Sequence, residues 1–304
     1  AILGHSSFNS YDVGVSWWSL DHHLGIRHSL LNGSFTGYAD LRRYNVIIMP
    51  SGYLEMSDYE VNALNDWIKQ GGTLIAHNRS SRFIASNETL GDVKQLQDVL
   101  DKSIDYNFDL LREIYALEDN LDQEAALKHI VDLETTYPWE LNETNYSEDE
   151  LKNRDKWQSI FMPSGAFVAG RTDQKHWLTF GTPKTLPVLY GNYPVLMTGN
   201  NAEAPIRIGE LVENSDVNEF RTINWSTLPA GKDIKVRMSG LVWPEAAQRI
   251  ANSAYLTRER VGKGQIILFA GEPNFRGSTR GTNRVWLNAI VYGPGLGTSP
   301  KIEL

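Results

Sequence analysis

The chain contains no cysteine among its 304 residues. This absence excludes disulfide bonds, thiolate-bound zinc and a cysteine nucleophile. No run of 18 apolar residues occurs either, so the sequence predicts no membrane-spanning helix. The hydrophobic content of 41% and the charged content of 22% are those of an ordinary globular protein with a sizeable core.

The motifs of several enzyme classes are also missing. Zinc peptidases of the carboxypeptidase type hold their metal with a His-x-x-Glu pair, and none of the seven histidines has Glu three residues later. The nearest pattern is His129 with Asp132. The chain has no Gly-x-Ser-x-Gly elbow of a serine hydrolase and no Walker or Gly-x-Gly-x-x-Gly motif of a nucleotide site. We therefore predict no catalytic residue and no nucleotide site in this chain.

Several histidines near the start of the chain are candidate metal ligands. His22, His23 and His28 lie close to Asp21, and His5 precedes them. Neighbouring positions at a helix end point in different directions. We therefore interpret these residues as structural or solvent-facing and predict no metal site, with a metal site that includes His5 as the alternative.

Negative charge is concentrated in one segment. Residues 87–155 hold 19 Asp and Glu against 6 Lys and Arg, a balance of −13, whereas the rest of the chain holds 18 against 23. We interpret 87–155 as an acidic, mainly helical insertion within a single domain that covers residues 1–304. It is either a solvated subdomain or a docking surface for another domain or chain. The chain has no dense Lys/Arg cluster, so nucleic acid is not an expected partner.

The clearest secondary-structure signals alternate between strands and helices. Buried strands are predicted at Asn45–Met49 and Thr73–His77, because short apolar runs end at turn signals. Between them, Ser57–Gln70 has a capping box and one apolar face, which predicts a helix. Another predicted helix covers Tyr11–Leu24. A further helix is predicted from the spacing of Val93, Leu96, Val99, Leu100 and Ile104, followed by helices at Tyr106–Leu117 and Gln123–Leu133.

The end of the chain repeats this pattern. Gln265–Ala270 predicts a strand that pairs with Tyr255–Arg260, and a polar loop follows at Gly271–Gly281. The helix after it has apolar residues at helical spacing. We predict an α/β fold with a doubly wound, mostly parallel sheet of flavodoxin-like type and additional strands. Of the nine tryptophans, those on predicted helices are expected in the core: Trp17, Trp18, Trp67 and Trp286. An exposed pair elsewhere would be able to stack on a sugar or a peptide.

Ligands of open α/β sheets bind beyond the carboxyl ends of the strands. The residues that follow the predicted strands therefore form a candidate ligand pocket: Ser51, Gly52, His77, Asn78, Glu272, Asn274, Arg276 and Arg280. Glycines near the two arginines would let a ligand carboxylate or phosphate approach. The alternative is that Arg276 pairs with Glu272 and only fixes the loop.

Four stretches resemble a known family. They are GKGQIILFAGEPNFRGSTRGTNRVWLNAI, SYDVGVSWWSLDHHLGI, YNVIIMPSGY and HWLTFGTPKTLPVLY. They resemble the class I glutamine-amidotransferase-like domain that follows the peptidase domain in bacterial zinc carboxypeptidases of the carboxypeptidase A type. The resemblance places Met49–Gly52 at the oxyanion hole, Ala76–Ser80 near the nucleophile turn and Phe269–Pro273 at the His-x-Glu position. Cysteine is absent and no histidine follows His176, so glutaminase activity is not expected.

The resemblance implies a non-catalytic accessory domain with a structural role or a role in peptide or glycan recognition. It implies an upstream peptidase domain of the same chain as partner, with zinc in that domain and no cofactor here. It also implies a secreted or periplasmic location and a fragment of a longer protein. Two alternatives stay open, namely a stand-alone small-molecule or sugar-binding protein of the same fold, and a hydrolase with a degenerate site that uses Ser51, His77 or Glu272.

Overall fold

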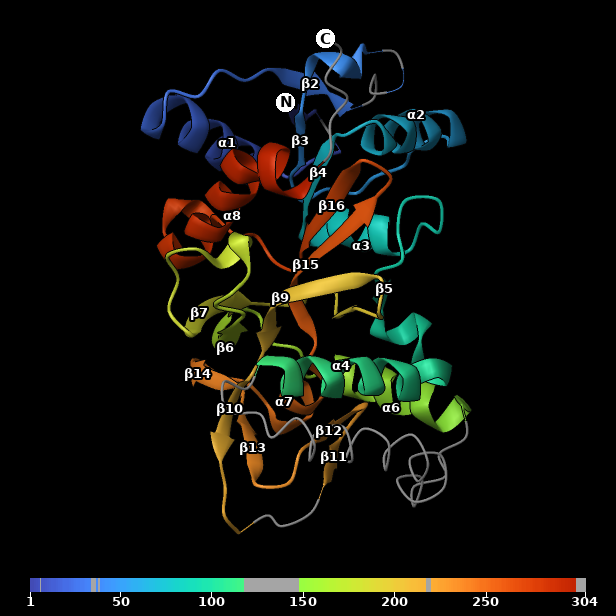
Figure 1. The fold of residues 1–304 in the computed structure, drawn as a ribbon, viewed down its shortest axis with the longest axis vertical. Helices are drawn as coiled ribbons and strands as arrows, with labels where there is room; N and C mark the ends of the chain where they lie inside the picture. The colour runs from blue at the N-terminus through green and yellow to red at the C-terminus, as the bar shows by residue number, and fades with distance from the viewer. Residues whose placement is uncertain (6, 34–36, 38, 118–147, 217–219, 299–304) are drawn as a thin grey trace.

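The computed structural model describes residues 1–304 except 6, 34–36, 38, 118–147, 217–219 and 299–304. The described residues form a 12-stranded sheet, with the path β14-β6-β9-β15-β16-β4-β3-β1-β2. Two small two-stranded antiparallel sheets accompany it. Figure 1 shows the large sheet running through the length of an elongated molecule.

One half of the sheet is parallel. Its strands are β2 (Leu30–Asn32), β1 (Ile2–Gly4), β3 (Val46–Met49), β4 (Thr73–His77) and β16 (Gly264–Phe269). Every residue of β1, β3, β4 and β16 is buried, as expected for strands covered on both faces. Numbered along the chain within this half, the order is 2-1-3-4-5, which is the flavodoxin-like order. The predicted fold class is confirmed.

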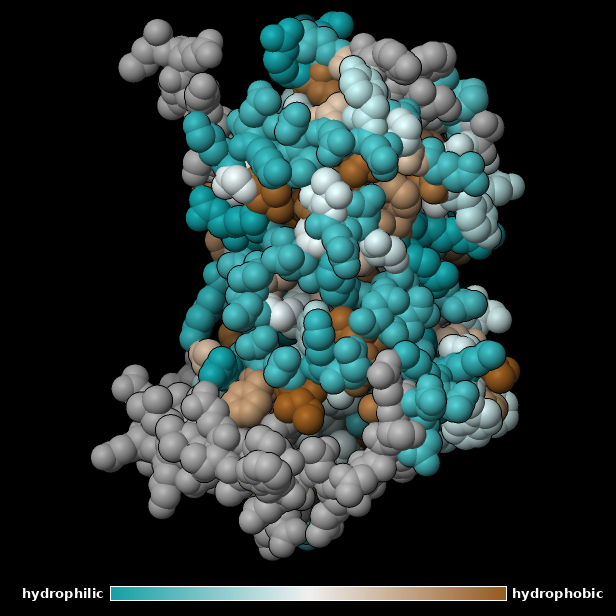
Figure 2. All heavy atoms as spheres, turned by 90° about the vertical axis from the view of Figure 1, so that its right-hand side faces the viewer, coloured by the Kyte–Doolittle hydropathy of each residue, from teal (hydrophilic) through white to brown (hydrophobic). Residues whose placement is uncertain are grey.

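Helices cover both faces of the parallel half. Figure 1 shows α1 (Ser10–Trp18) and α8 (Arg280–Tyr292) on one face, and α2 (Asp58–Lys69) and α3 (Asn78–Ala85) on the other. The helix α2 begins where the sequence predicts it. Ser57 Oγ accepts the Glu60 N–H and the Glu60 carboxylate accepts the Ser57 N–H, so both bonds of the capping box form. The surface over α2 and α3 is mostly hydrophilic, with separate apolar spots (Figure 2).

The other half of the sheet is antiparallel and begins at β15, which pairs with β16 as predicted. These strands lie in the lower part of Figure 1. The antiparallel strands are β15 (Ala254–Val261), β9 (Ala202–Ile208), β6 (Ala166–Thr172), β7 (Thr185–Tyr190), β14 (Arg237–Ser239), β5 (Lys94–Gln95) and β8 (Leu196–Met197). The two small sheets pair β10 (Glu210–Glu213) with β13 (Lys232–Lys235) and β11 (Arg221–Ile223) with β12 (Ser226–Leu228).

The first part of the acidic segment, residues 87–155, does not have the predicted secondary structure. The expected helix from Val93 to Ile104 is wrong, because β5 pairs with β8 and two short 3-10 turns follow. The Glu259 carboxylate accepts the Asp92 and Val93 N–H groups, which holds this backbone against β15. Helix α4 (Ser103–Leu117) contains the second predicted helix. The expected helix Gln123–Leu133 lies outside the described residues.

Two further helices complete the lower part of the molecule. α6 (Glu148–Ser159) and α7 (Pro244–Ile250) are joined by a buried ion pair in which Arg249 binds the Asp155 carboxylate through two bonds, of 2.8 and 3.1 Å. Among the residues that the structure describes, no helix is long and apolar enough to cross a membrane.

The core lies mainly between the sheet and its helices. Its largest fully buried side chains are Trp286, Tyr190, Tyr255 and Phe269. Trp67 and Trp286 are buried as predicted. The expectation that Trp17 and Trp18 belong to the core is wrong, because they are 40% and 39% exposed. They lie in the last turn of α1, where the chain leaves the sheet.

Candidate functional site

The carboxyl ends of β1, β3, β4 and β16 meet at one edge of the sheet. We call the residues around this edge the edge site: Asp12, Ser51, Gly52, Tyr53, His77, Asn78, Arg79, Tyr193 and Glu272. Five of the eight predicted pocket residues belong to it. The sequence does not single out the other four, which are Asp12, Tyr53, Arg79 and Tyr193.

A buried contact between Asp12 and His77 forms the floor of the edge site. Asp12 Oδ2 accepts the Ser51 N–H at 2.6 Å and lies 3.1 Å from His77 Nδ1. The Asp12 and His77 side chains are 1% and 0% exposed. Because a carboxylate only accepts hydrogen bonds, Nδ1 carries the imidazole proton. The pair therefore holds α1, β3 and β4 together at the edge site.

Local sequence explains why Asp12 lies there. Asn9 caps α1, and its side chain accepts the Tyr11 and Asp12 N–H groups. An acidic residue in the first turn of a helix also interacts favourably with the helix dipole. The Asn-x-x-Asp spacing at positions 9–12 is the one signal in the sequence from which this residue could have been found.

The turn between β4 and α3 has an unusual backbone. Asn78 has φ = 46°, in the left-handed region that side chains other than Gly and Asn rarely adopt. α3 begins at Asn78 itself, so no loop separates it from β4. The Ser80 hydroxyl donates to the Pro50 carbonyl, and the Ser81 hydroxyl donates to the Phe269 carbonyl at 2.8 Å. These two bonds lock α3 onto β3 and β16.

Glu272 follows β16 and is half-buried beside the floor pair. Burial raises the pKa of its carboxyl group, and the Asp12 charge raises it further. His77, a hydrogen bond from Asn78 and the charge of Arg79 act in the opposite direction without cancelling the rise. Glu272 therefore takes up a proton more readily than an ordinary glutamate.

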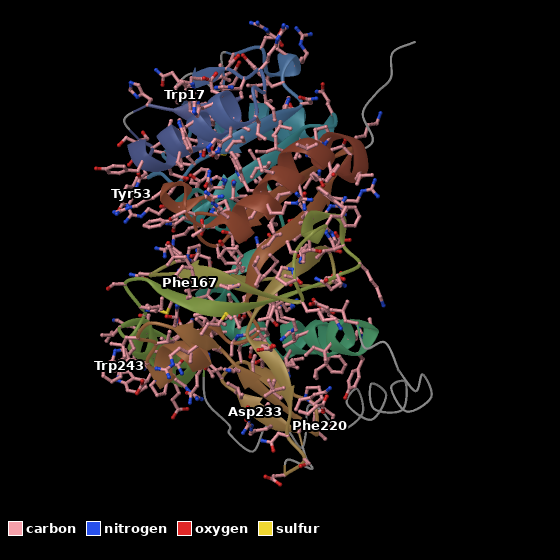
Figure 3. All side chains as sticks on the ribbon, turned by 90° about the vertical axis from the view of Figure 1, so that its left-hand side faces the viewer. Trp17, Tyr53, Phe167, Phe220, Asp233 and Trp243 are labelled. Carbon is pink, nitrogen blue, oxygen red and sulfur yellow. The ribbon has the colours of Figure 1, made fainter. Side chains whose placement is uncertain are left out.

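The outer part of the edge site is aromatic and cationic. The Arg79 guanidinium lies 4.0 Å from the centre of the Tyr53 ring. Tyr53 is 71% exposed and points outward from the loop after β3 (Figure 3). On the inner side, burial and the charges of Glu272 and Asp12 raise the pKa of Tyr193. The site thus offers a cation, a carboxyl group, an amide and phenol rings.

Gly52 is required by a close approach of backbone. A Cβ atom at this position would lie 2.8 Å from the Ser7 carbonyl oxygen, which real Cβ atoms essentially never do. Gly52 also forms an isolated bridge with Phe8. The loop after β1 therefore packs directly on the loop after β3, as expected at the point where the strand order reverses.

The three remaining predicted pocket residues lie elsewhere. The Asn274 amide donates to Ser19 Oγ at 2.5 Å and packs the loop on α1. Arg276 is exposed and lies over the Phe275 ring, and among the described residues no carboxylate forms an ion pair with it. The alternative in which Arg276 pairs with Glu272 is therefore wrong. Arg280 is the exposed first residue of α8 and not part of the preceding loop.

Two strained backbone positions lie at this edge of the sheet. Five non-glycine residues of the described chain have positive φ. Two of them, His5 and Asn78, directly follow the carboxyl ends of β1 and β4. Strained residues cost roughly 1–3 kcal/mol each and cluster at ligand sites. This distribution supports the edge site as the functional part of the molecule.

The polar groups of the edge site differ in how accessible they are to a ligand. The hydroxyls of Ser80 and Ser81 are bound to carbonyl groups, and His77 is fully buried. Across the described ranges, no group of three or more His, Asp or Glu side chains lies close enough together to hold a metal ion. Asn78, Arg79 and Glu272 offer hydrogen-bond donors and acceptors of both charge types to a polar ligand.

No protein-family model and no curated protein matches this chain. A solved ThuA-like protein from Parabacteroides merdae has a similar structure, with a TM-score of 0.51 and 9% identity, and the match covers 99% of this chain and 91% of that one. A second ThuA-like protein, from Bacteroides uniformis, matches at a TM-score of 0.44 and 12% identity over 95% and 88% of the two chains. At such identity the first likeness shows the fold alone, which is amidotransferase-like.

Proposed function

We propose that this chain is a non-catalytic amidotransferase-like domain that recognises a polar ligand at the edge site. The observation that carries the proposal is the turn at Asn78. This turn has a left-handed backbone, and the Asn78 amide is bonded to the half-buried Glu272 carboxyl group. The Asn78 side-chain amide is not a nucleophile, and the chain has no cysteine that could act as one.

The charges of the edge site favour a peptide over a glycan as the ligand. Arg79 is exposed and suits a carboxylate, such as the free end of a peptide. Glu272 and Asn78 suit amide or ammonium donors. A neutral glycan would leave the guanidinium and the carboxyl group without ionic partners.

We further propose that the domain serves a zinc carboxypeptidase domain upstream in a secreted or periplasmic parent protein. Its support is the resemblance of the four sequence stretches. In this arrangement the edge site holds peptides for hydrolysis by the zinc site of the other domain. The domain itself requires no metal.

Zinc content and carboxypeptidase activity test this assignment when the 304-residue chain is compared with its full-length parent. Zinc and hydrolysis of peptides are expected in the parent only. Stoichiometric zinc or turnover in the 304-residue chain would contradict it and favour a hydrolase with a degenerate site. In that case Glu272→Gln, which removes the titratable carboxyl group, separates catalysis by Glu272 from other mechanisms.

A further inference from the structure

A polar groove separate from the edge site lies at the C-terminal end of α1, whereas Asp12 lies in the first turn of this helix. It has a volume of about 610 Å³ and is lined by Trp17, Asp21, Gly25, Ile26, Arg27, His28 and Leu30. This volume is within the range of about 300–1,000 Å³ that is usual for small-molecule sites. Figure 3 shows Trp17 at the outer surface of α1, separate from Tyr53 of the edge site. We call it the Trp17 groove.

The local sequence shapes this groove. After α1 the chain makes a π-helical turn at Ser19–His23, a widening that is frequent at functional sites. The Gly25 N–H then binds the Asp21 carbonyl, and the Ile26 N–H binds the Leu20 carbonyl. The bond from Gly25 to Asp21, with Gly25 at φ = 61°, ends the helix in an αL motif. It reverses the chain, so Ile26–His28 returns beside Trp17.

The groove combines an aromatic surface with polar groups. Trp17 is 40% exposed and is the only aromatic ring other than His28 that lines it. Asp21 and Arg27 are exposed and carry opposite charges. His28 Nδ1 donates to the Ile26 carbonyl at 2.8 Å, so in the neutral ring Nε2 is an acceptor. Carboxylate, guanidinium and imidazole thus surround one exposed indole.

We propose that the Trp17 groove binds a neutral sugar. A pyranose ring has an apolar C–H face, which suits the indole surface, and a rim of hydroxyl groups that both donate and accept hydrogen bonds. Asp21 and His28 Nε2 supply acceptors, and Arg27 supplies donors. The two full charges balance, which favours a neutral ligand over an acidic or a basic one. This site is independent of the peptide site proposed at the strand edge.

The test is binding of neutral disaccharides to the 304-residue chain, measured by saturation-transfer NMR and tryptophan fluorescence. The probes are maltose, cellobiose and lactose. At least one is expected to bind, and Trp17→Ala is expected to weaken its binding at least tenfold, while Trp17→Phe keeps part of it. Asp21→Ala and Arg27→Ala are each expected to weaken it severalfold, because each removes hydrogen bonds to hydroxyl groups.

Trp157→Ala is the matched control, because Trp157 is 51% exposed and lies on α6. Binding is expected to be unchanged in this variant and in Glu272→Gln. Circular dichroism checks that the Trp17 variants are folded. Failure of all three sugars to bind overturns the proposal, as does equal binding by folded Trp17→Ala. Binding of a charged peptide in the groove in place of the sugars also overturns it.

Discussion

Asn78 shows how much a single residue determines at the edge site. Its backbone lies in the left-handed region, and its amide reaches Glu272. Both features follow from its place directly after a buried strand. The residues around it differ in how far the sequence reveals them. Ser51, His77, Asn78 and Glu272 can be predicted because each ends or follows a recognisable strand. Arg79 and Tyr193 cannot, because their contacts depend on elements distant in the chain.

Substitutions of Asn78 separate backbone strain from hydrogen bonding. Asn78→Ala is expected to lower the free energy of unfolding by about 1 kcal/mol, because alanine has no polar side chain whose local hydrogen bonds offset the strain of a Cβ atom at positive φ. Asn78→Gly is expected to cost less, because glycine adopts this conformation readily. Urea unfolding measures both. Equal losses in the two variants would mean that the amide, and not the backbone, determines the stability of the turn.

Glu272 makes stability depend on pH. Its pKa is raised in the folded state, so between its ordinary pKa and the raised value the folded chain binds more protons than the unfolded chain. The free energy of unfolding therefore falls as pH rises through that window. Glu272→Gln is expected to raise Tm at pH 8 by about 2 °C and to have a smaller effect at pH 4. Glu88→Gln, an exposed control, should show no such difference. A larger gain at pH 4 would contradict this assignment.

At the scale of secondary-structure elements, the local sequence predicts an element correctly where the element satisfies its own hydrogen bonds. The capping box and apolar face of α2 predict its limits to within a residue. The segment from Val93 to Leu100 has helical spacing too, but its backbone pairs with β8 and is held by Glu259. Such tertiary contacts outweigh the helical periodicity of the segment. The sequence of the segment itself does not reveal them.

The cap of α2 is testable by itself. Ser57→Ala removes the acceptor for the Glu60 N–H and is expected to lower the free energy of unfolding by about 1 kcal/mol. Glu60→Ala removes the opposite bond. Since the two bonds support each other, the double variant is expected to lose less than the two single losses combined. Strict additivity in chemical unfolding would show that the two bonds act independently.

At the scale of the whole molecule, the parallel strands bring the ends of distant segments to one edge. The 2-1-3-4-5 order places the loops after β1 and β3 at the reversal of strand order. The sequence predicts this architecture, because βαβ units allow few arrangements. The antiparallel half is less predictable, since its short strands pair over long separations, such as β5 with β8 and β6 with β14.

The most direct test of the account is isothermal titration calorimetry with tripeptides that carry a free carboxylate and with their amidated forms. The account predicts binding of the free acids, at least tenfold weaker binding of the amides, and loss of this preference in Arg79→Gln. It also predicts weaker binding in Glu272→Gln. Equal affinity for both peptide forms, or unchanged binding in both variants, would contradict recognition at the edge site.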